Sequence, residues 1–522
     1  MSYKVFIPTA GIGSRLSSFT SSLNKSLVSV NNKPIISHII NFFPSDSEFV
    51  IALGHKGNIV KEFLENLYPQ RKINFEFIDP YIGKKSGLGY TMLSCKHLLR
   101  EPFIFISCDT LVLNDIPSPD HNWIAYSKKA DILPYRTVEI KSNTVKNFKE
   151  KGEGILGKDF PYIGLCGINN YYDFWQAMID ARSNKIDIGE VSGLISLVNN
   201  SLKCYEMNWF DTGNLESLNI ARDKLKSLNS PVILEKEGEA IWFLDNKVVK
   251  FSTDMNFIKN RVLRVKEIVD FVPKIIKSSK HMYVYQKEEG DVFSNKSNLP
   301  LFKKLLEEST IFWQKKNLDK NLKKEFKKNC LSFYRDKTLK RLKKFFDEFE
   351  KKDEKQIING EKVQTLESLI RLLDWDYLSD GLPVRFHGDF HFENIIWNSK
   401  KNKFVFLDWR QDFGGCLSYG DLYYDLAKLM HGLIVSHQII HKKQFKIEWN
   451  YQIINFELRR FQRDVEFESF FNEWILKNGF DLKKVKILTS LIYLNIAPLH
   501  HEPYNYLLFA LGKLMLHRQL NY

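Results

Sequence analysis

Residues 386–397, FHGDFHFENIIW, place two histidines, two acids and an asparagine in one short stretch between apolar residues. Buried carboxylates are unfavourable unless cations or hydrogen-bond donors neutralise them. Asp389 and Asn394 stand five residues apart within this stretch. The stretch therefore predicts phosphate chemistry, in which bound cations and phosphates offset the cost of burying such groups.

A second stretch, PTAGIGSRL at 8–16, places Gly11 and Gly13 after a predicted strand and before a longer loop. Glycine lets backbone N–H groups approach an anion closely, because it carries no side chain and tolerates positive φ. A dinucleotide fingerprint would need a third glycine where Leu16 stands, and a Walker loop would need Gly-Lys-Ser/Thr. Neither alternative fits, and the loop is predicted to wrap a phosphate.

This second stretch resembles the signature of the nucleotidyltransferases that make nucleotide-activated sugars and phosphoamino-alcohols. The matching positions, in chain order, are Gly11, Gly13, Arg15, Leu16, Thr20, Lys25, Lys33 and Pro34. One departure is Ser26, where many members have proline. The resemblance implies that Arg15 and Lys25 supply positive charge to a triphosphate as pyrophosphate leaves. Standing alone, Lys25 would be interpreted as a surface lysine.

Two acids extend the resemblance. Asp109 ends the apolar run PFIFISCDT, and Asp211 precedes a glycine turn in NWFDTGNLESL. Open α/β sheets bind ligands at the carboxyl ends of their strands. The resemblance implies that this pair holds Mg²⁺. Alone, either acid would be interpreted as a turn or helix-cap residue.

A glycine-containing loop, GKKSGLGYT at 83–91, follows the third predicted strand. It matches the place where members of this family recognise the base and sugar of the nucleotide. By that resemblance Gly87, Gly89 and Lys85 are expected to contact the nucleotide.

The stretch FHGDFHFENIIW resembles the catalytic loop of the aminoglycoside phosphotransferase and choline kinase families, whose pattern is His-Gly-Asp-x-x-x-x-Asn. The resemblance implies that Asp389 accepts or orients the proton of an attacking hydroxyl and that Asn394 holds Mg²⁺. His387 would brace the loop. Asp408, after the apolar run KFVFL, matches the metal-binding acid of kinases. His391 is interpreted as a packed, hydrogen-bonded histidine.

The segment YGDLYYDLAKL at 419–429, with Gly420, Asp421 and Asp425, follows in the order expected for these kinases. One departure is Arg410, where many choline-kinase-like members carry an acid. We interpret Arg410 as a residue that grips an anionic substrate or a nucleotide phosphate. This interpretation argues against a cationic, choline-like acceptor.

Lys250, in the run KVVKF, is the candidate for the lysine that contacts the ATP phosphates. No glycine-rich loop precedes it, and it is also interpreted as an ordinary strand lysine. Its partner acid on the following helix is Glu267 or none.

The elements that position these residues alternate along the first part of the chain. Short apolar runs at 4–10, 48–53, 73–78 and 102–107 predict strands, with helical patterns between them. This alternation indicates right-handed βαβ crossovers and a mostly parallel sheet. Residues 1–228 are therefore predicted to form an open, Rossmann-like α/β domain, and the motif resemblance implies that it is a nucleotidyltransferase domain.

The pattern changes after this point. The segment at 240–251 predicts two strands around an Asp-Asn turn, 281–287 predicts one more, and nearly all of the remainder is expected to be helical. A small sheet followed by a large helical part indicates a two-lobed α+β domain, and the resemblance of its motifs implies a protein-kinase-like fold. The predicted domain spans 232–522, with a small lobe at about 232–290 and a helical lobe at about 291–522.

The composition is that of a globular protein. A length of 522 residues favours two to four domains, and 76 basic against 62 acidic residues give a formal charge of +14. Much of the excess lies at 315–329 and 337–355, which we interpret as solvated faces of amphipathic helices. A basic face for duplex binding is the alternative, and no recognition module supports it.

Cysteine usage and hydropathy bear on the compartment. The six cysteines form no CxxC pair or zinc-type cluster, which favours reduced thiols and a cytoplasmic location. No leader pattern is recognised, and no apolar run reaches the length of a membrane span.

Together the two resemblances predict a bifunctional transferase. The kinase domain would phosphorylate a small sugar, polyol or amino alcohol with ATP, and the other domain would add NMP from CTP or UTP to the product. The expected ligands are the hydroxyl acceptor, its phosphate, nucleoside triphosphates and Mg²⁺, without nucleic acid. Surface polysaccharide is the expected use of the product. The alternatives are one catalytic and one regulatory or assembly domain, or antibiotic inactivation.

Overall fold

The computed structural model describes residues 3–16, 19–83, 86–129, 131–183, 189–226 and 237–521. These residues form two compact units. The first unit comprises Met1–Met255 with Ile276–Tyr285, and the second comprises Asn256–Ile275 with Gln286–Tyr522. The domain boundary expected between 228 and 232 lies outside the described residues.

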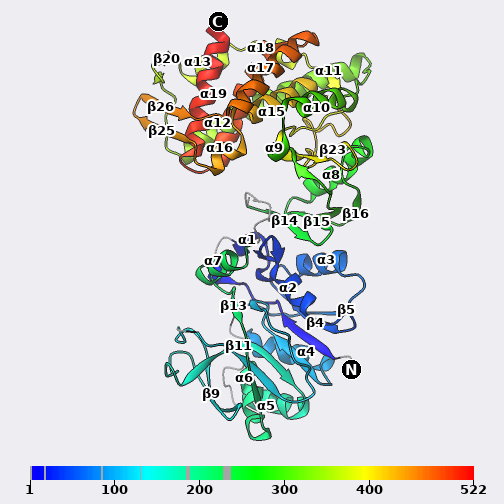
Figure 1. Cartoon of the computed structure of the whole chain (residues 1–522), viewed down its shortest axis with the longest axis vertical. Coiled ribbons are helices and arrows are strands. Elements are labelled where there is room, and N and C mark those ends of the chain that lie inside the picture. Colours follow the sequence, from blue (N-terminus) through cyan, green and yellow to red (C-terminus); the bar gives the residue numbers. More distant parts are fainter. Residues whose placement is uncertain are drawn as a thin grey trace. The chain divides into compact units, whose positions relative to one another are not determined.

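A nine-stranded sheet with the order β5-β4-β1-β6-β11-β8-β12-β10-β9 forms the centre of the first unit (Figure 1). Four neighbouring strands run parallel, as predicted: β5 (Lys72–Phe77), β4 (Glu48–Leu53), β1 (Lys4–Pro8) and β6 (Phe103–Ile106). The other strands are β11 (Asp159–Ile168), β8 (Trp123–Tyr126), β12 (Lys203–Glu206), β10 (Thr144–Lys149) and β9 (Thr137–Lys141).

The second half of this sheet is mixed. Strand β11 runs antiparallel to β6 and β8, and β9 and β10 form a hairpin. Ser142 and Asn143, both with positive φ, make the tight turn of that hairpin, and so short a connection requires antiparallel pairing. The prediction of a mostly parallel sheet is therefore correct for one half only.

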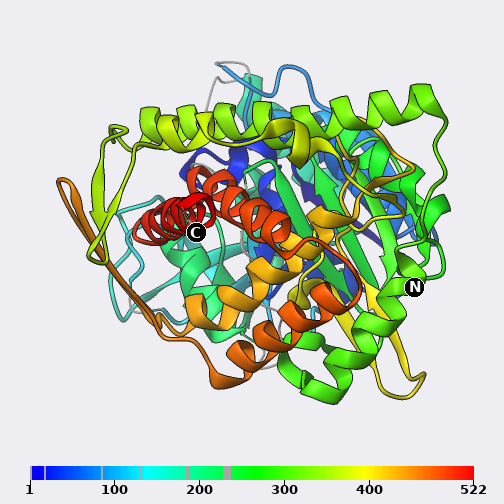
Figure 2. The same cartoon turned by 90° about the horizontal axis from the view of Figure 1, so that it is seen from above.

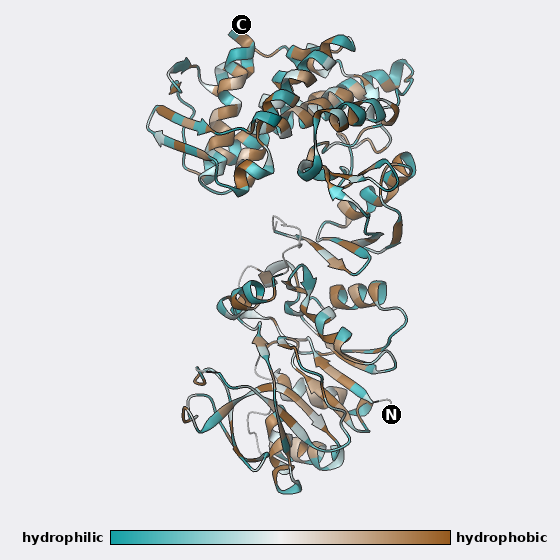
Figure 3. Cartoon of the chain, in the orientation of Figure 1, coloured by the Kyte–Doolittle hydropathy of each residue, from teal (hydrophilic) through white to brown (hydrophobic). Residues whose placement is uncertain are grey.

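Helices cover both faces of the sheet. Successive strand residues point to opposite faces, so Val5 and Ile7 of β1 join one core and Phe6 joins the other. The first core includes α2 (Ile35–Phe42) and α3 (Gly57–Leu67). The second includes α4 (Leu88–Cys95), α5 (Tyr171–Ser183) and α6 (Glu190–Ser196). Figure 3 shows the strands between these layers as mostly hydrophobic.

A four-stranded sheet, β14-β15-β17-β16, also belongs mainly to the first unit. Its strands are β14 (Glu239–Leu244), β15 (Lys247–Ser252), β17 (Met282–Gln286) and β16 (Ile275–Ser278), so the strands predicted here are confirmed. Trp242 packs edge-on against Phe63 of α3, with ring centres 5.2 Å apart. His281 Nδ1 lies 2.8 Å from a carboxylate oxygen of Glu62, also on α3.

The predicted small lobe is consequently divided. Its strands lie mainly in the first unit, whereas α8 (Met255–Ile268) lies in the second from Asn256 onward. The boundaries given above for the two domains stay predictions.

The second unit is mainly helical. Helices α15 (Leu422–Ile434), α18 (Leu482–Ile496) and α19 (Tyr504–Asn521) pack side by side, and α12 (Lys337–Glu348) packs on α18 (Figure 2). The other helices of this unit are α9 (Phe293–Lys296), α10 (Leu299–Phe312), α11 (Lys320–Leu331), α13 (Leu366–Arg371), α14 (Trp375–Ser379), α16 (His437–His441) and α17 (Gln462–Lys477).

Three small sheets interrupt the helices. The first, β18-β22-β23, flanks the His-Gly-Asp motif and contains β18 (Asp291–Val292), β22 (Ile395–Asn398) and β23 (Lys403–Phe406). The second pairs β21 (Pro383–Val384) with β24 (Gly420–Asp421). The third contains β19 (Gln356–Ile358), β20 (Glu361–Val363), β25 (Phe445–Asn450) and β26 (Ile453–Leu458).

The third sheet contradicts the prediction that this region is almost wholly helical. In β25 half-buried and exposed residues alternate, and no residue is fully buried, so the strand carries no strong apolar run. All six cysteines are free thiols, as expected. Among the described residues we find no helix with the length and apolar character of a membrane span.

Candidate active sites

The glycine loop after β1 is shaped by contacts with Lys25. Gly13 has a φ of +71°, and a Cβ added there would lie 3.0 Å from side-chain atoms of both Lys25 and Thr20. The Asn24 side chain donates to the carbonyl oxygen of Thr9 at 2.8 Å and accepts from the N–H of Ser26. These bonds fix the backbone from which Lys25 extends.

Lys25 forms an ion pair with Asp109, with Nζ 2.9 Å from Oδ2. Ser107 Oγ donates to the other carboxylate oxygen at 2.5 Å. Burial disfavours both charges, but the attraction between them prevails: it lowers the pKa of Asp109 to about 2 and raises the pKa of Lys25. The pair is therefore ionised at neutral pH.

Two short strands bring Asp211 to the same place. Strand β13 (Trp209–Asp211) pairs antiparallel with β7 (Thr110–Val112), so Asp211 faces Thr110. The next residue, Thr212, donates through its N–H and its hydroxyl to the carbonyl oxygen of Asp109, at 3.0 and 2.9 Å. The two predicted metal ligands are thus held together through the backbone.

Gly213 marks the point on which these side chains converge. A Cβ added there would lie 3.0 Å from Asp109 Oδ2, 3.1 Å from Asp211 Oδ1 and 3.4 Å from Arg15 Nη2. The structure thereby brings together Arg15, Lys25, Asp109 and Asp211, which are about two hundred residues apart at most. Any side chain at position 213 would occupy the space between the two carboxylates.

This donor set fits Mg²⁺. Two carboxylates face one small space, and Mg²⁺ binds through one or two carboxylates and completes its shell with phosphates and water. Asp211 is oriented by the hydroxyl of Tyr135, which donates to Oδ2 at 3.0 Å, and by the N–H of Gly213, which donates to Oδ1 at 2.8 Å.

The remaining predicted nucleotide residues of this unit lie on loop and helix termini. No described atom comes within 4 Å of a Cβ added at Gly11 or Gly87, so both positions are open. Gly87 has a φ of +134° and precedes α4, while Gly89 is buried in the first turn of that helix. Lys85 lies outside the described residues.

In the second unit, Asp425 of α15 holds the His-Gly-Asp loop by its backbone. Its carboxylate accepts from the N–H of His387 at 2.7 Å, from the N–H of Gly388 at 2.6 Å and from Trp313 Nε1 at 3.0 Å. Burial raises the pKa of Asp425 to about 6, although these donors favour the charged form. Asp425 is thus a positioning residue for Asp389.

His387 ties the loop to the segment that carries Asp408. Its Nε2 donates to the carbonyl oxygen of Leu407 at 2.8 Å, and its Nδ1 accepts from the N–H of Asp389 at 3.1 Å. The ring is fully buried, and burial lowers its pKa to about 3. A neutral imidazole with one donor and one acceptor satisfies both contacts.

Asp389 faces cations. Lys428 Nζ lies 2.7 Å from Oδ1, and His391 Nε2 lies 3.6 Å from Oδ2. The Asn394 amide also donates to Oδ2, at 3.1 Å. Burial opposes ionisation, but Lys428 and His391 hold the pKa of Asp389 well below its ordinary value. The carboxylate is therefore available to accept a hydrogen bond at neutral pH.

Asp408 lies on a backbone segment adjacent to Asn394. The N–H of Leu407 donates to the carbonyl oxygen of Asn394 at 2.7 Å, and Asp408 adopts a φ of +56°. Its carboxylate pairs with Arg261 of α8. A carboxylate is a ligand that Mg²⁺ accepts, and an ion bound by Asp408 would take the place that Arg261 now occupies.

The candidate phosphate lysine, Lys250, and its candidate partner acid, Glu267, belong to different units. Lys250 lies in β15, in the first unit, and its role stays a prediction. Glu267 of α8 pairs with Lys316 at 3.1 Å.

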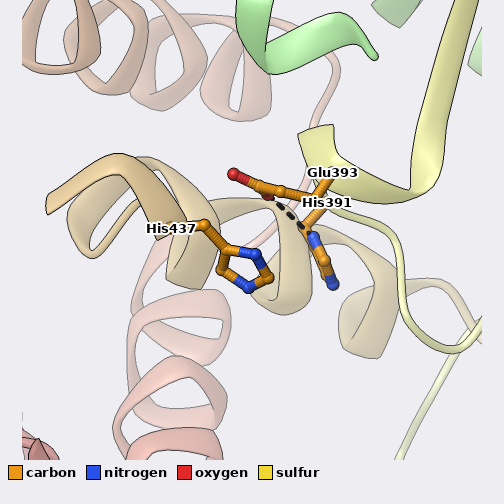
Figure 4. A group of neighbouring side chains, drawn as sticks. All are labelled: His391, Glu393 and His437. Atoms are coloured by element: carbon orange, nitrogen blue, oxygen red, sulfur yellow. Dashed lines mark hydrogen bonds and ion pairs between the residues drawn. The ribbon is translucent and has the colours of Figure 1, made fainter. Parts of the chain in front are cut away.

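His391, Glu393 and His437 form a further polar group (Figure 4). One ligand atom from each lies within 4.8 Å of the others, a set that divalent transition metals accept. His391 is buried and hydrogen-bonded, as expected: Nδ1 lies 3.0 Å from Glu393 and Nε2 faces Asp389. A metal here would displace contacts that the ring already makes.

Sequence reasoning did not single out several residues of these sites. Lys428 stands three residues after Asp425, so both project from neighbouring turns of α15, and that spacing was the available signal. Tyr135 and Arg261 had no such signal, because their partners Asp211 and Asp408 are far away in sequence.

Each unit therefore carries acids paired with cations at the end of a strand or loop, as phosphoryl and nucleotidyl transfer require. Comparison with known proteins finds transferases similar to both parts of the chain. Residues 328–439 match the model of the phosphotransferase enzyme family, a span that includes Asp389, Asn394 and Asp408.

The N-terminal part is similar to sugar-phosphate nucleotidyltransferases. Glucose-1-phosphate cytidylyltransferase of Salmonella typhimurium is 24% identical, over 29% of this chain and 70% of its own length. D-glycero-alpha-D-manno-heptose 1-phosphate guanylyltransferase of Aneurinibacillus thermoaerophilus is 26% identical, over 28% and 68%. Among solved structures, a putative glucose-1-phosphate thymidylyltransferase from Bacillus anthracis covers 45% of this chain and 98% of its own at 18% identity, with a TM-score of 0.38. The chain thus carries an N-terminal part similar to sugar-phosphate nucleotidyltransferases and a C-terminal segment that matches a phosphotransferase family.

The neutral state of His387 predicts a pH dependence of stability. Its pKa is about 3 in the folded protein and near 6.5 when unfolded, so its contribution is complete above pH 6.5 and is lost as the pH falls. Between pH 7 and pH 5 the apparent free energy of unfolding of the second unit should fall by about 2 kcal/mol from this residue. Urea titrations of the wild type and His387→Gln should show that difference in pH dependence. An equal change in unfolding free energy with pH in both proteins would contradict this prediction.

Proposed function

We propose that the chain is a bifunctional enzyme. Its second unit phosphorylates a hydroxyl of a small sugar, polyol or amino alcohol with ATP. Its first unit transfers NMP from an NTP, with CTP or UTP preferred, to the phosphorylated product and releases pyrophosphate. The observation that carries the proposal is the presence in one chain of two separate groups of acids paired with lysines, each beside a predicted metal site.

In the nucleotidyl step, an oxygen of the substrate phosphate attacks the α-phosphorus of the NTP. The bond from that phosphorus to the bridging oxygen breaks, and pyrophosphate leaves with the electron pair. Arg15 and Lys25 stabilise the negative charge that develops on the triphosphate. Asp109 keeps Lys25 charged and in place through their 2.9 Å ion pair.

In the kinase step, Asp389 accepts the proton of the acceptor hydroxyl, whose oxygen attacks the γ-phosphorus of ATP while ADP leaves. Lys428 keeps Asp389 ionised, and Asp425 fixes its backbone. In both sites bound Mg²⁺ would neutralise the phosphate oxygens around the reacting phosphorus, held by Asp109 and Asp211 or by Asn394 and Asp408.

The product–substrate relation links the two activities. The kinase makes a phosphomonoester, which is the substrate class that the nucleotidyltransferase consumes. Relatives of the first unit act, by their names, on sugar 1-phosphates. Activated precursors for surface polysaccharide are the use we propose for the product.

One observation favours a second candidate function, in which the second unit is regulatory. The Asp408 carboxylate is already paired with Arg261, which occupies the contact that a metal would make. The variants below separate the two candidates.

Incubation with ATP, Mg²⁺, a second NTP and a mixture of sugars, polyols and amino alcohols should yield an NDP-linked product, detected by mass. Both ADP and pyrophosphate should accumulate, and chelation of divalent ions should stop both. Pyrophosphate release without ADP, from an added sugar phosphate, would instead support the regulatory candidate.

Asp109→Asn should lower pyrophosphate release by about 10²- to 10³-fold, because it removes charge from the predicted metal site and leaves Lys25 without its partner. ADP formation by the second unit should stay unchanged. The matched control is Asp180→Asn, at an exposed position on α5, which should keep both activities. Full activity in Asp109→Asn would rule out this site.

Asp389→Asn should lower acceptor-dependent ADP formation by about 10³-fold, with pyrophosphate release from an added sugar phosphate retained. Asp376→Asn, whose side chain is 82% exposed on α14, is the control. If Asp389→Asn kept its ADP formation, the kinase assignment would be wrong.

A further inference from the structure

A cavity of about 890 Å³ opens in the second unit between α12 and Arg410, two residues after the predicted metal acid Asp408. Lys337 and Arg341 of α12 line it, together with Arg410. Arg410 connects it to the catalytic loop: a Cβ added at Gly388 would lie 2.5 Å from the Cβ of Arg410. Gly388 is the residue before Asp389, so Arg410 borders both the cavity and the loop that carries the predicted catalytic acid.

The cations of this cavity lie close to one another. Lys337 Nζ lies 4.1 Å from the ring centre of Phe333, and Arg410 Cζ lies 4.8 Å from the same ring centre. The backbone N–H of Arg410 donates to the carbonyl oxygen of His387 at 2.9 Å, which fixes the residue on the catalytic loop. We call Lys337, Arg341 and Arg410 the cation cluster.

Within the described part of the chain, no ion pair joins Lys337, Arg341 or Arg410 to an acid, and Arg410 Nε is buried without a hydrogen bond. Acids still act at longer range: Glu348 favours the charged form of Arg341, and Asp336 also lines the cavity.

The rim of the cavity differs. There Lys343 pairs with Asp347 at 2.7 Å and Lys344 pairs with Glu348 at 3.2 Å. The interpretation of α12 as a solvated basic face therefore holds for the rim lysines but not for the cation cluster.

Electrostatics point the same way. Burial, and then repulsion from Arg410, Lys428 and Arg341, lowers the pKa of Lys337 well below its ordinary value, and only Asp389 opposes the shift. Asp389 is already paired with Lys428. Like charges gathered in a half-buried space destabilise the protein unless an anion binds among them.

The helix geometry at the cavity wall is also unusual. A π-helical turn, Ser332–Asp336, separates α11 from α12 and carries Phe333, the ring that both Lys337 and Arg410 contact. π-Turns occur often at functional sites, because the extra residue redirects side chains at a small cost in helix stability.

We propose that the cation cluster binds an anionic group of the hydroxyl acceptor, a carboxylate or a phosphate, so that the second unit phosphorylates an acidic sugar or polyol. This proposal rests on the kinase activity proposed above. The cluster lies next to Asp389, so an anion held there would place a hydroxyl of the same molecule near the carboxylate that accepts its proton. A planar guanidinium such as that of Arg410 matches either anion through two hydrogen bonds.

The first test compares acceptors that differ only in charge. Glycerol, D-glycerate and glycerol 3-phosphate form one series, and glucitol and gluconate form another. A hydrogen-bonded charge pair contributes enough to raise kcat/KM of an anionic member about 10- to 100-fold above the neutral member. Preference for the neutral member in both series would overturn the proposal.

The second test uses variants. Arg410→Gln and Arg341→Gln should raise KM for the acidic acceptor about 10-fold or more relative to KM for ATP and to KM for the neutral acceptor. Lys343→Gln, which removes a paired rim cation, is the control and should change none of them. A rise in KM for ATP alone would assign the cluster to a nucleotide phosphate and overturn the proposal.

A binding measurement separates this proposal from the kinase assignment. Calorimetric titration of D-glycerate and gluconate into protein saturated with ADP and Mg²⁺ should show binding by the wild type that Arg410→Gln weakens. Binding without any ADP formation from ATP would support the anion site and overturn the kinase activity. Phosphorylation of glycerol or glucitol, with no binding of either acid, would overturn the anion site and keep the kinase activity.

Discussion

Each proposed site depends on an aspartate that is kept ionised by a lysine close to it. Asp109 pairs with Lys25 at 2.9 Å, and Asp389 pairs with Lys428 at 2.7 Å. In a partly buried environment neither partner is stable as a lone charge, because burial removes hydration energy that only an opposite charge nearby can replace. The pairing therefore fixes the charge state of the site before any nucleotide arrives, and most of the surrounding contacts serve to keep the two partners in register.

The supports for these pairs are mainly backbone hydrogen bonds. Thr212 bonds the carbonyl oxygen of Asp109, and Asp425 binds two consecutive N–H groups of the loop that carries Asp389. Such bonds restrain the chain itself rather than a rotatable side chain, which gives the carboxylates small positional freedom. Both sites thus achieve rigidity in the same way on unrelated scaffolds.

Local patterns predicted the parts of this arrangement that depend on local sequence. The apolar runs of β1, β4 and β6 were recognisable because buried parallel strands are continuously hydrophobic. The edge strand β5 was recognisable from its alternating apolar residues. The acids were recognisable by motif. The β9–β10 hairpin, the β25–β26 sheet and the burial of Lys337 were not, because each depends on partners distant in sequence or on a two-sided polar strand. Helical periodicity predicts which face of a helix a residue occupies. It does not predict whether that face borders bulk water or a cavity.

The path of the chain between its two units has a consequence for dissection of the protein. It leaves the first unit after Met255, returns for Ile276–Tyr285 and leaves again. The returning segment supplies β17, whose Met282 and Val284 join the same core as Trp242 and α3. A single cut near residue 230 would separate β14, β15, β16 and β17 from the rest of the first unit. The core that they share with α3 would then be exposed in the N-terminal half, and these strands would lack their packing partners in the C-terminal half. Neither half is therefore expected to fold as an independent domain, and truncation studies need boundaries that keep the returning segment with the first unit.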